Sequence, residues 1–89
     1  MVWTIEFTKA SDRSLEKLSS QDNKRILKYL NEQVAPLHNP RMLGRALKGN
    51  KYSGCWRYRV GDYRVIAEIK DLIVTIAVIE IGHRREVYR

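Results

Sequence analysis

The first stretch of the chain alternates between apolar and polar side chains. Residues 2–8 place Trp3, Ile5 and Phe7 at every second position, with polar residues between them. A period of two is typical of a strand with one buried face. We therefore expect the chain to begin with a half-buried β-strand.

From about residue 11 to residue 35 the apolar positions recur at helical spacing instead. A Ser-Ser pair divides this stretch, and Ser11 and Ser20 are suitable N-caps for two successive helices. Pro36 and Pro40 end the second helix and open a loop. The inward-facing positions of the two helices are Leu15, Leu18, Ile26, Leu27, Leu30 and Val34.

The second half of the chain has the pattern of strands. Residues 41–53 have weak periodicity and predict a basic loop with at most one short helical turn. Residues 55–60, 63–69 and 72–81 are rich in β-branched and aromatic residues, and Gly82 ends the last of them. The order β-α-α-β-β-β predicts an α+β fold: a small antiparallel or mixed sheet, two helices on one face and the opposite face open.

Length and composition narrow the class of protein. Eighty-nine residues allow one small domain, residues 1–89, and 44% hydrophobic residues indicate a globular chain. One cysteine and two histidines make no recognisable metal set, so we expect no metal and no cofactor. No apolar run approaches the roughly 20 residues of a membrane span, and the first residues lack a signal-peptide layout. We expect a cytoplasmic protein that does not enter a membrane.

The formal net charge of +7 is concentrated in one segment. Residues 41–64 hold seven basic side chains against Asp62 alone, a net of +6: Arg41, Arg45, Lys48, Lys51, Arg57, Arg59 and Arg64. Such a cluster favours a polyanionic partner such as nucleic acid, although a solvated basic surface would have the same composition.

The turn at Gly61-Asp62 sets the register of the first predicted hairpin. Gly at the first of two loop positions predicts a type II′ turn, which places Arg59 directly opposite Arg64. Arg57 shares their face, because side chains two apart in a strand do so. Opposed like charges are unfavourable, and an anionic ligand such as phosphate would relieve them. The other face is apolar and should meet the helices: Trp56, Tyr58, Val60, Tyr63, Val65, Ala67 and Ile69.

A second turn at Lys70-Asp71 would bring the C-terminal residues to the same place. It places Asp62 opposite Ile79 and Ile81 level with Val60, so residues 82–85 emerge beside the Arg59–Arg64 pair. An imidazole, two further guanidiniums and the phenol of Tyr88 would then join the arginines. Phosphate binding, a group that titrates near neutral pH and an aromatic surface are the parts of an RNA site.

Three motifs together resemble a known family. LKG (47–49), WRYRVGDYRV (56–65) and IGHRREVY (81–88) are similar to the RelE/ParE superfamily of bacterial toxins, and most of all to its RelE branch. The resemblance implies a RelE-like microbial RNase fold and a ribosome-dependent endoribonuclease that cuts messenger RNA in the ribosomal A site. It also implies a RelB-like antitoxin partner, a monomeric free toxin and a hetero-oligomer with the antitoxin.

The resemblance implies roles for individual residues. Arg57 and Arg59 would bind phosphate and help to activate the ribose 2′-hydroxyl, and Arg64 would stabilise charge on the phosphate. Arg84 would assist the leaving group, and Tyr88 would stack on a base. Residues that would grip 16S ribosomal RNA are Arg41, Arg45, Lys48, Lys51 and Arg85.

The proton acceptor is left open by the sequence. The best-known branch has lysines where this chain has Arg57 and Arg59, and arginine, with a pKa above about 12, is a poor general base. The other candidate for the proton acceptor is His83, because histidine side chains have an ordinary pKa of about 6.5. Two further functions stay open: a ParE-like inhibitor of DNA gyrase without RNase activity, and a basic RNA-binding module or degenerate toxin that only binds its antitoxin.

Overall fold

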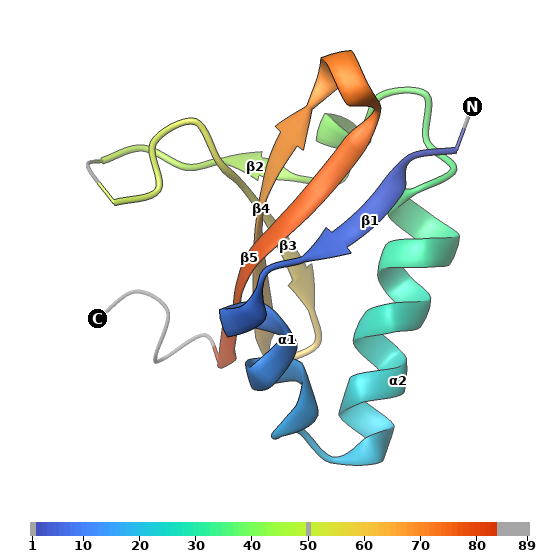
Figure 1. The fold of residues 1–89 in the computed structure, drawn as a ribbon, viewed down its shortest axis with the longest axis vertical. Helices are drawn as coiled ribbons and strands as arrows, with labels where there is room; N and C mark the ends of the chain where they lie inside the picture. Colours follow the sequence, from blue (N-terminus) through green and yellow to red (C-terminus); the bar gives the residue numbers. More distant parts are fainter. Residues whose placement is uncertain (1, 50, 84–89) are drawn as a thin grey trace.

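The computed structural model describes residues 2–49 and 51–83. Its helices and helical turns are α1 (Lys9–Glu16), α2 (Ser20–Tyr29), a π-helical turn (Leu30–Val34) and 3-10 turns at Pro40–Met42 and Asp71–Ile73. Its strands are β1 (Thr4–Phe7), β2 (Arg45–Ala46), β3 (Trp56–Val60), β4 (Tyr63–Lys70) and β5 (Thr75–His83) (Figure 1).

The strands form one mixed sheet in the order β1-β5-β4-β3-β2. β1 pairs parallel to β5, and every other pair of neighbours is antiparallel. The predicted α+β class and mixed sheet are confirmed. One strand was missed: β2 lies within the predicted basic loop and pairs with β3. A strand of two residues is too short to display an alternating pattern, so only its pairing with β3 defines it.

Both helices begin one to three residues earlier than expected. Thr8 caps α1, and its hydroxyl accepts a hydrogen bond from the Ser11 backbone N–H at 3.2 Å. Ser11 was predicted as this cap, but it lies inside α1, fully buried, and donates to the Val78 carbonyl at 2.8 Å. Ser19, not Ser20, caps α2. The buried Ser11 hydroxyl therefore ties α1 to β5 instead of starting the helix.

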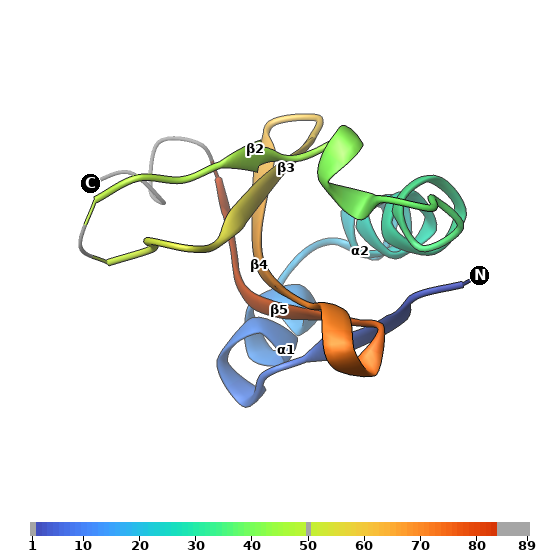
Figure 2. The same ribbon diagram turned by 90° about the horizontal axis from the view of Figure 1, so that it is seen from above.

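The core lies between the helices and the sheet. Leu15 of α1 and Ile26 of α2 pack with the following π-helical turn against the central strands. Figure 2 shows α2 on one side of the sheet and the loop between β2 and β3 extending to the other. The aromatic residues predicted to face the core are there: Trp3 and Tyr58 are buried, while Trp56 and Tyr63 are half-buried against the cluster. No helix of residues 2–49 and 51–83 is long and apolar enough to cross a membrane.

The first hairpin has the predicted register throughout. Val60 pairs with Tyr63, and Arg59 pairs with Arg64. Gly61 has a φ of +60°, as the first position of a type II′ turn requires. A Cβ at this position would also lie 2.8 Å from Nη1 of Arg25, but that exposed side chain can move aside, so it is the turn that requires glycine.

The second hairpin differs from the prediction. β4 runs on to Lys70, which pairs with Thr75, and residues 71–74 form the turn. Leu72 and Ile73 were predicted to start the last strand, but they are exposed in a 3-10 turn. Val74 closes this turn with a left-handed φ of 49°. Because the turn is longer and β5 holds one extra residue, Gly82 lies directly opposite Arg64 and His83 opposite Tyr63.

A β-bulge in β5 changes which side chains share a face. Ile66 pairs with Glu80 but Ala67 pairs with Val78, so Ile79 is the extra residue. A bulge of one residue reverses the alternation beyond it. Val78 and Ile81 therefore both enter the core, and Glu80 and Gly82 lie on the opposite face.

The sequence predicts that the opposite face of the sheet is open, but in the structure it is partly covered. Ile66 is fully buried there, and Arg64 is only 6% exposed. The loop between β2 and β3 returns toward the sheet, where the Tyr52 hydroxyl donates a hydrogen bond to the Glu80 carboxylate. The arginines consequently lie on a partly enclosed surface instead of a flat one.

Candidate functional site: an arginine face on the sheet

Four arginines share the face of the sheet away from the core: Arg45 of β2, Arg57 and Arg59 of β3, and Arg64 of β4. We call this set the arginine face. Arg45 pairs directly with Arg57, and Arg59 pairs directly with Arg64. Directly paired residues have Cβ atoms about 4.5–5.5 Å apart, so two like-charged pairs stand side by side here. The sequence predicted the second pair and missed the first, because β2 was not recognised.

The four arginines differ in their exposure. Arg64 is almost fully buried, Arg57 is half-buried, and Arg45 and Arg59 are exposed. The Arg64 guanidinium donates through Nη1 to the carbonyl of Tyr63 at 3.3 Å. Because water is largely excluded around Arg64, its charge attracts an anion more strongly than an exposed arginine would. The face therefore combines a deep cation with cations that a ligand meets first.

Gly82 is the neighbour of the deepest arginine in the sheet. It lies opposite Arg64 in β5, and a glycine places no side chain on the sheet surface. The row Arg59–Arg64–Gly82 therefore carries two guanidiniums, on β3 and β4, and no side chain of its own on β5. A planar guanidinium carries donors in a fork that matches two oxygens of one phosphate. This row can hold a phosphodiester group.

The loop between β2 and β3 adds further cations beside this face. Lys48 and Lys51 are exposed, and the Lys51 ammonium lies 5.2 Å from the centre of the Tyr52 ring. Tyr52 in turn donates to Glu80, so the loop is joined to β5 next to the arginines. The predicted RNA-gripping residues Arg45, Lys48 and Lys51 therefore belong to one segment.

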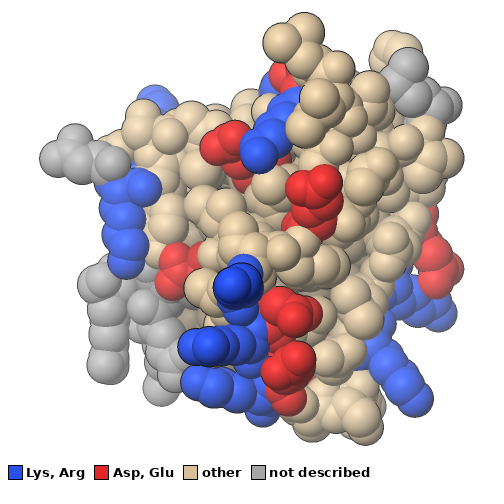
Figure 3. Space-filling model, viewed as in Figure 1, with Lys and Arg blue, Asp and Glu red and all other residues tan. Residues whose placement is uncertain are grey.

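The basic character is not uniform over the molecule. In Figure 3 acidic and basic side chains lie side by side over α1. This helix carries Lys9 and Arg13 together with Asp12 and Glu16. The charge surplus of residues 41–64 is thus a feature of the strands and their loop, not of the helical surface.

Arg41, predicted as part of the RNA grip, has a structural role here. Its guanidinium forms an ion pair of 2.6 Å with Asp71 and lies 5.7 Å from the centre of the Trp56 ring. The hydrogen bond between the two partners raises the pKa of Arg41 and lowers that of Asp71. Arg41 therefore connects the two 3-10 turns on the core side of β3, away from the arginine face.

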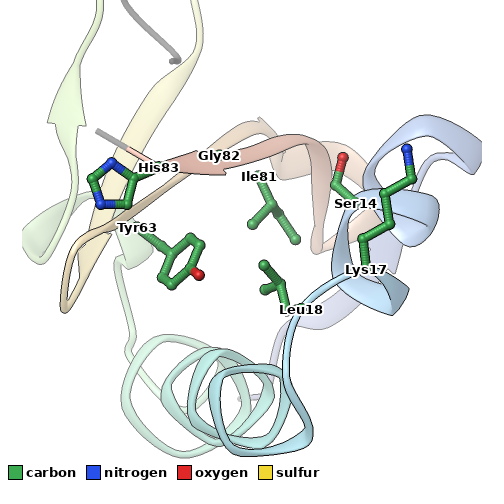
Figure 4. Close-up of a pocket in the computed structure, with 7 residues that line it drawn as sticks. All are labelled: Ser14, Lys17, Leu18, Tyr63, Ile81, Gly82 and His83. Carbon is green, nitrogen blue, oxygen red and sulfur yellow. The ribbon is translucent and has the colours of Figure 1, made fainter. Parts of the chain in front are cut away.

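His83 lies at the same edge of the sheet as Gly82 but points to the helix side. Its ring meets that of Tyr63 edge-on, with centroids 5.9 Å apart. Tyr63 donates to the Asp22 carboxylate at 3.1 Å. Figure 4 shows these side chains around an open cavity of about 480 Å³, whose lining is Ser14, Lys17, Leu18, Tyr63, Ile81, Gly82 and His83. The structure does not bring His83 onto the arginine face.

The remaining candidates add little to the described site. Arg84, Arg85 and Tyr88 lie outside the described residues. Cys55 is a half-buried free thiol, and burial followed by the charge of Glu68 raises its pKa, which keeps it protonated and a poor nucleophile. Across the two described ranges no three His, Cys, Asp or Glu side chains are grouped as metal ligands.

Glu80 and Tyr52 are the residues at this face that the sequence reasoning missed. Glu80 interrupts the apolar run of residues 72–81, and this single charged position was the available signal. The predicted register gave it no place on the face, because neither the four-residue turn nor the bulge was foreseen.

Comparison with known proteins identifies similar chains. The model of the family described as the ParE toxin of the type II toxin–antitoxin system parDE matches residues 5–88. Toxin RelG of Mycobacterium tuberculosis is 26% identical over 89 residues, which covers 100% of this chain and 99% of that protein.

Solved structures share the fold. The toxin–antitoxin complex RelBE2 of M. tuberculosis matches with a TM-score of 0.84 and 23% identity, covering 97% of this chain and 95% of the other. An archaeal RelE–RelB complex from Pyrococcus horikoshii matches with a TM-score of 0.70 and 23% identity, covering 98% and 100%. At this identity the likeness shows the fold alone.

Proposed function

This chain belongs to the RelE/ParE superfamily of type II toxin–antitoxin toxins, and we propose that it is a ribosome-dependent endoribonuclease that cuts messenger RNA in the ribosomal A site. Residues 1–89 act as a single toxin domain in the cytoplasm, where ribosomes translate. The ribose 2′-hydroxyl attacks the adjacent phosphate, and the products are a 2′,3′-cyclic phosphate and a free 5′-hydroxyl.

The observation that carries this proposal is the row Arg59–Arg64–Gly82. Attack on a phosphodiester concentrates negative charge on the phosphate oxygens, and fixed cations that face this charge are usually the largest catalytic contribution. Arg64 is buried, so it is held in place before the substrate arrives. Arg59 stands opposite it and is exposed, so it meets the phosphate on entry.

The other predicted residues take supporting roles in the same proposal. Arg57, half-buried beside Arg59, binds the phosphate on the next row, while Arg45, Lys48 and Lys51 contact 16S ribosomal RNA. Arg84 assists the leaving group, Tyr88 stacks on a base and Arg85 joins the RNA grip. No metal or cofactor takes part.

The proposal includes a protein partner. The similar structures from M. tuberculosis and P. horikoshii are complexes of a RelE toxin with a RelB antitoxin. We infer that this chain likewise binds a RelB-like antitoxin, which masks the arginine face, and that the free toxin is a monomer. A short acidic reading frame beside the gene would supply such a partner.

The experiment is brief expression in bacteria followed by primer extension on a translated reporter. We expect translation to stop and cuts to appear inside translated codons, and to disappear when the start codon of the reporter is removed. Cuts that persist without the start codon would argue against dependence on the ribosome.

A second function is favoured by one observation. The matching family model is that of the ParE toxin. The resemblance to ParE implies a protein that inhibits DNA gyrase by binding it. Gyrase-linked DNA breaks without RNA cuts, in the same expression experiment, would move the assignment to this alternative.

A further inference from the structure

Among the described residues, Glu80 is the carboxylate next to the Arg64–Gly82 row, and the β-bulge puts it there. With Ile79 as the extra residue, Glu80 lies on the same face as Arg64 and pairs with Ile66, which pairs in turn with Arg57. Gly82 pairs with Arg64, so Glu80 is the diagonal neighbour of Arg64. Diagonal neighbours are about 7–8 Å apart, a span that a glutamate and an arginine side chain can bridge.

The Glu80 carboxylate is held in a fixed orientation. Tyr52 reaches it from the loop between β2 and β3 and donates its hydroxyl proton to Oε2. Glu80 is half-buried, so the bond is partly protected from water. An ionised carboxylate accepts about four hydrogen bonds, so the bond from Tyr52 orients the group and leaves lone pairs for another donor.

The proposed reaction needs a proton acceptor that the arginines cannot be. A guanidinium is protonated at every pH at which proteins work. His83 points to the helix side, toward Tyr63. Glu68 shares the face of Glu80 but lies two residues beyond Ile66 along β4, next to Cys55 and away from the Arg64–Gly82 row. Of the carboxylates in residues 2–49 and 51–83, Glu80 is the one that lies diagonal to the buried Arg64 and on the row of Arg57 and Ile66.

We propose that Glu80 takes the proton from the ribose 2′-hydroxyl, with Tyr52 as its positioning residue; this inference rests on the proposed RNase function. The 2′-oxygen forms its bond to phosphorus as its proton passes to a Glu80 carboxylate oxygen. The bond from phosphorus to the 5′-oxygen breaks, and the leaving oxygen takes a proton from water. The hydroxide that remains accepts the proton from Glu80, which restores the carboxylate.

A purely electrostatic role for Glu80 makes the opposite prediction. If this glutamate only moderates the repulsion among Arg57, Arg59 and Arg64, its neutralisation makes the face more positive. A more positive face binds messenger RNA as well or better, and cleavage is unchanged or faster. A loss of rate with retained binding therefore separates proton transfer from charge balance.

The test is single-turnover cleavage of messenger RNA on purified, programmed ribosomes, with saturating protein. Glu80→Gln keeps the shape and can still accept the bond from Tyr52, but it cannot take up a proton. We expect a rate loss of roughly 100-fold or more, the range for removal of a general base, with ribosome affinity equal to or tighter than that of the wild type.

Three further variants complete the comparison. Glu68→Gln removes a carboxylate from the same face and should stay within about threefold of the wild-type rate, since it touches no reacting atom. Glu80→Asp keeps a carboxylate and should cleave about tenfold faster than Glu80→Gln. Tyr52→Phe should lose less than about tenfold, in kcat and not in KM, because it loosens the base without removing it.

The pH profile supplies an independent measurement. The groups that face Glu80 are Arg64 from β4, Arg57 from β3 and Tyr52 from the loop. We expect the wild-type rate to fall as the pH is lowered through the range in which carboxylates take up protons. Glu80→Gln should lack this dependence.

The outcomes that contradict the inference are distinct from those that contradict the proposed function. Glu80→Gln at near wild-type rate, or Glu80→Asp no faster than Glu80→Gln, overturns the role of Glu80 while the RNase stands. Equal losses in Glu80→Gln and Tyr52→Phe with weaker ribosome binding indicate only an anchor for the loop, which also overturns it. A wild-type protein that cuts nothing on ribosomes overturns both.

Discussion

Arg59 and Arg64 lie directly opposite each other across the β3–β4 hairpin, one exposed and one buried. Like charges in this arrangement oppose folding, and a threonine or valine at either position would avoid the repulsion. The pair makes sense as a binding device: the exposed guanidinium draws a phosphate in and the buried one holds it. Its cost in stability is then a consequence of function.

Arg59→Thr should therefore make the protein more stable and less active. Removing one of two opposed charges and adding a β-branched residue should raise the free energy of unfolding by roughly 0.2–1 kcal/mol. Urea unfolding measures this change, and ribosomal cleavage measures the loss of activity. A variant that is both less stable and fully active would contradict the functional reading of the pair.

Arg64→Ala should abolish most of the cleavage. Loss of a buried cation aimed at the developing charge should lower the single-turnover rate by about 10²–10³-fold. Arg64→Lys retains the charge but not the fork, and should lie between the alanine variant and the wild type. Arg13→Ala, at an exposed arginine of α1, is the matched control and should cleave normally. Antitoxin binding by Arg64→Ala would show that the fold is intact.

Tyr58→Phe should lower stability at neutral pH by about 1 kcal/mol, because the buried hydroxyl donates to the Pro40 carbonyl at 2.8 Å. This bond holds the Pro40–Met42 turn under β3. Gly44 packs closely on the same ring, since a Cβ there would lie 3.1 Å from the Tyr58 ring and would require it to shift by a few tenths of an ångström. Urea unfolding of Tyr58→Phe, with half-buried Tyr29→Phe as the control, measures the contribution.

The same residue predicts a loss of stability at alkaline pH. Burial raises the pKa of Tyr58 to about 12, above its ordinary value of 10. The unfolded chain therefore releases this proton first, and stability falls as the pH rises from 10 toward 12. The difference between wild type and Tyr58→Phe should narrow over this range. A constant difference would mean that the phenol titrates normally.

The ion pair between Arg41 and Asp71 should make a small contribution to folding stability that is lost at acid pH. The hydrogen bond that the Arg41 guanidinium donates lowers the pKa of Asp71 below the ordinary value of 3.8. The pair therefore stabilises the fold above that pH. Its contribution is lost as the pH falls through the lowered value. Asp71→Asn should be slightly less stable than wild type at pH 7, since exposed pairs contribute little, and the two should converge in strong acid. Urea midpoints across this range measure the difference.

The parts of the fold with strong local signals were predictable. Gly61-Asp62 has the chemistry of one turn type, and that turn fixes the pairing of Arg59 with Arg64. The alternation of residues 2–8 and the helical spacing of Ile26 and Leu30 likewise led to the observed strand and helix. In each case the local pattern and the tertiary packing require the same conformation.

The second hairpin was not predictable, because there local and tertiary preferences conflict. Leu72 and Ile73 have strand propensity, yet they lie in a turn that Val74 closes in a left-handed conformation. The bulge at Ile79 has no mark in the sequence, and only the packing of both Val78 and Ile81 in the core reveals it. Glu80 therefore appeared on the arginine face only in the structure.

The most direct test of the account is the chemistry of the cut ends. Purified protein should cut messenger RNA only on ribosomes, leaving a 2′,3′-cyclic phosphate upstream and a 5′-hydroxyl downstream, and Arg64→Ala should leave most of the message uncut over the same time. Ends with a 3′-hydroxyl and a 5′-phosphate, or the same cuts by Arg64→Ala, would contradict the assignment of the arginine face as the site of phosphodiester cleavage.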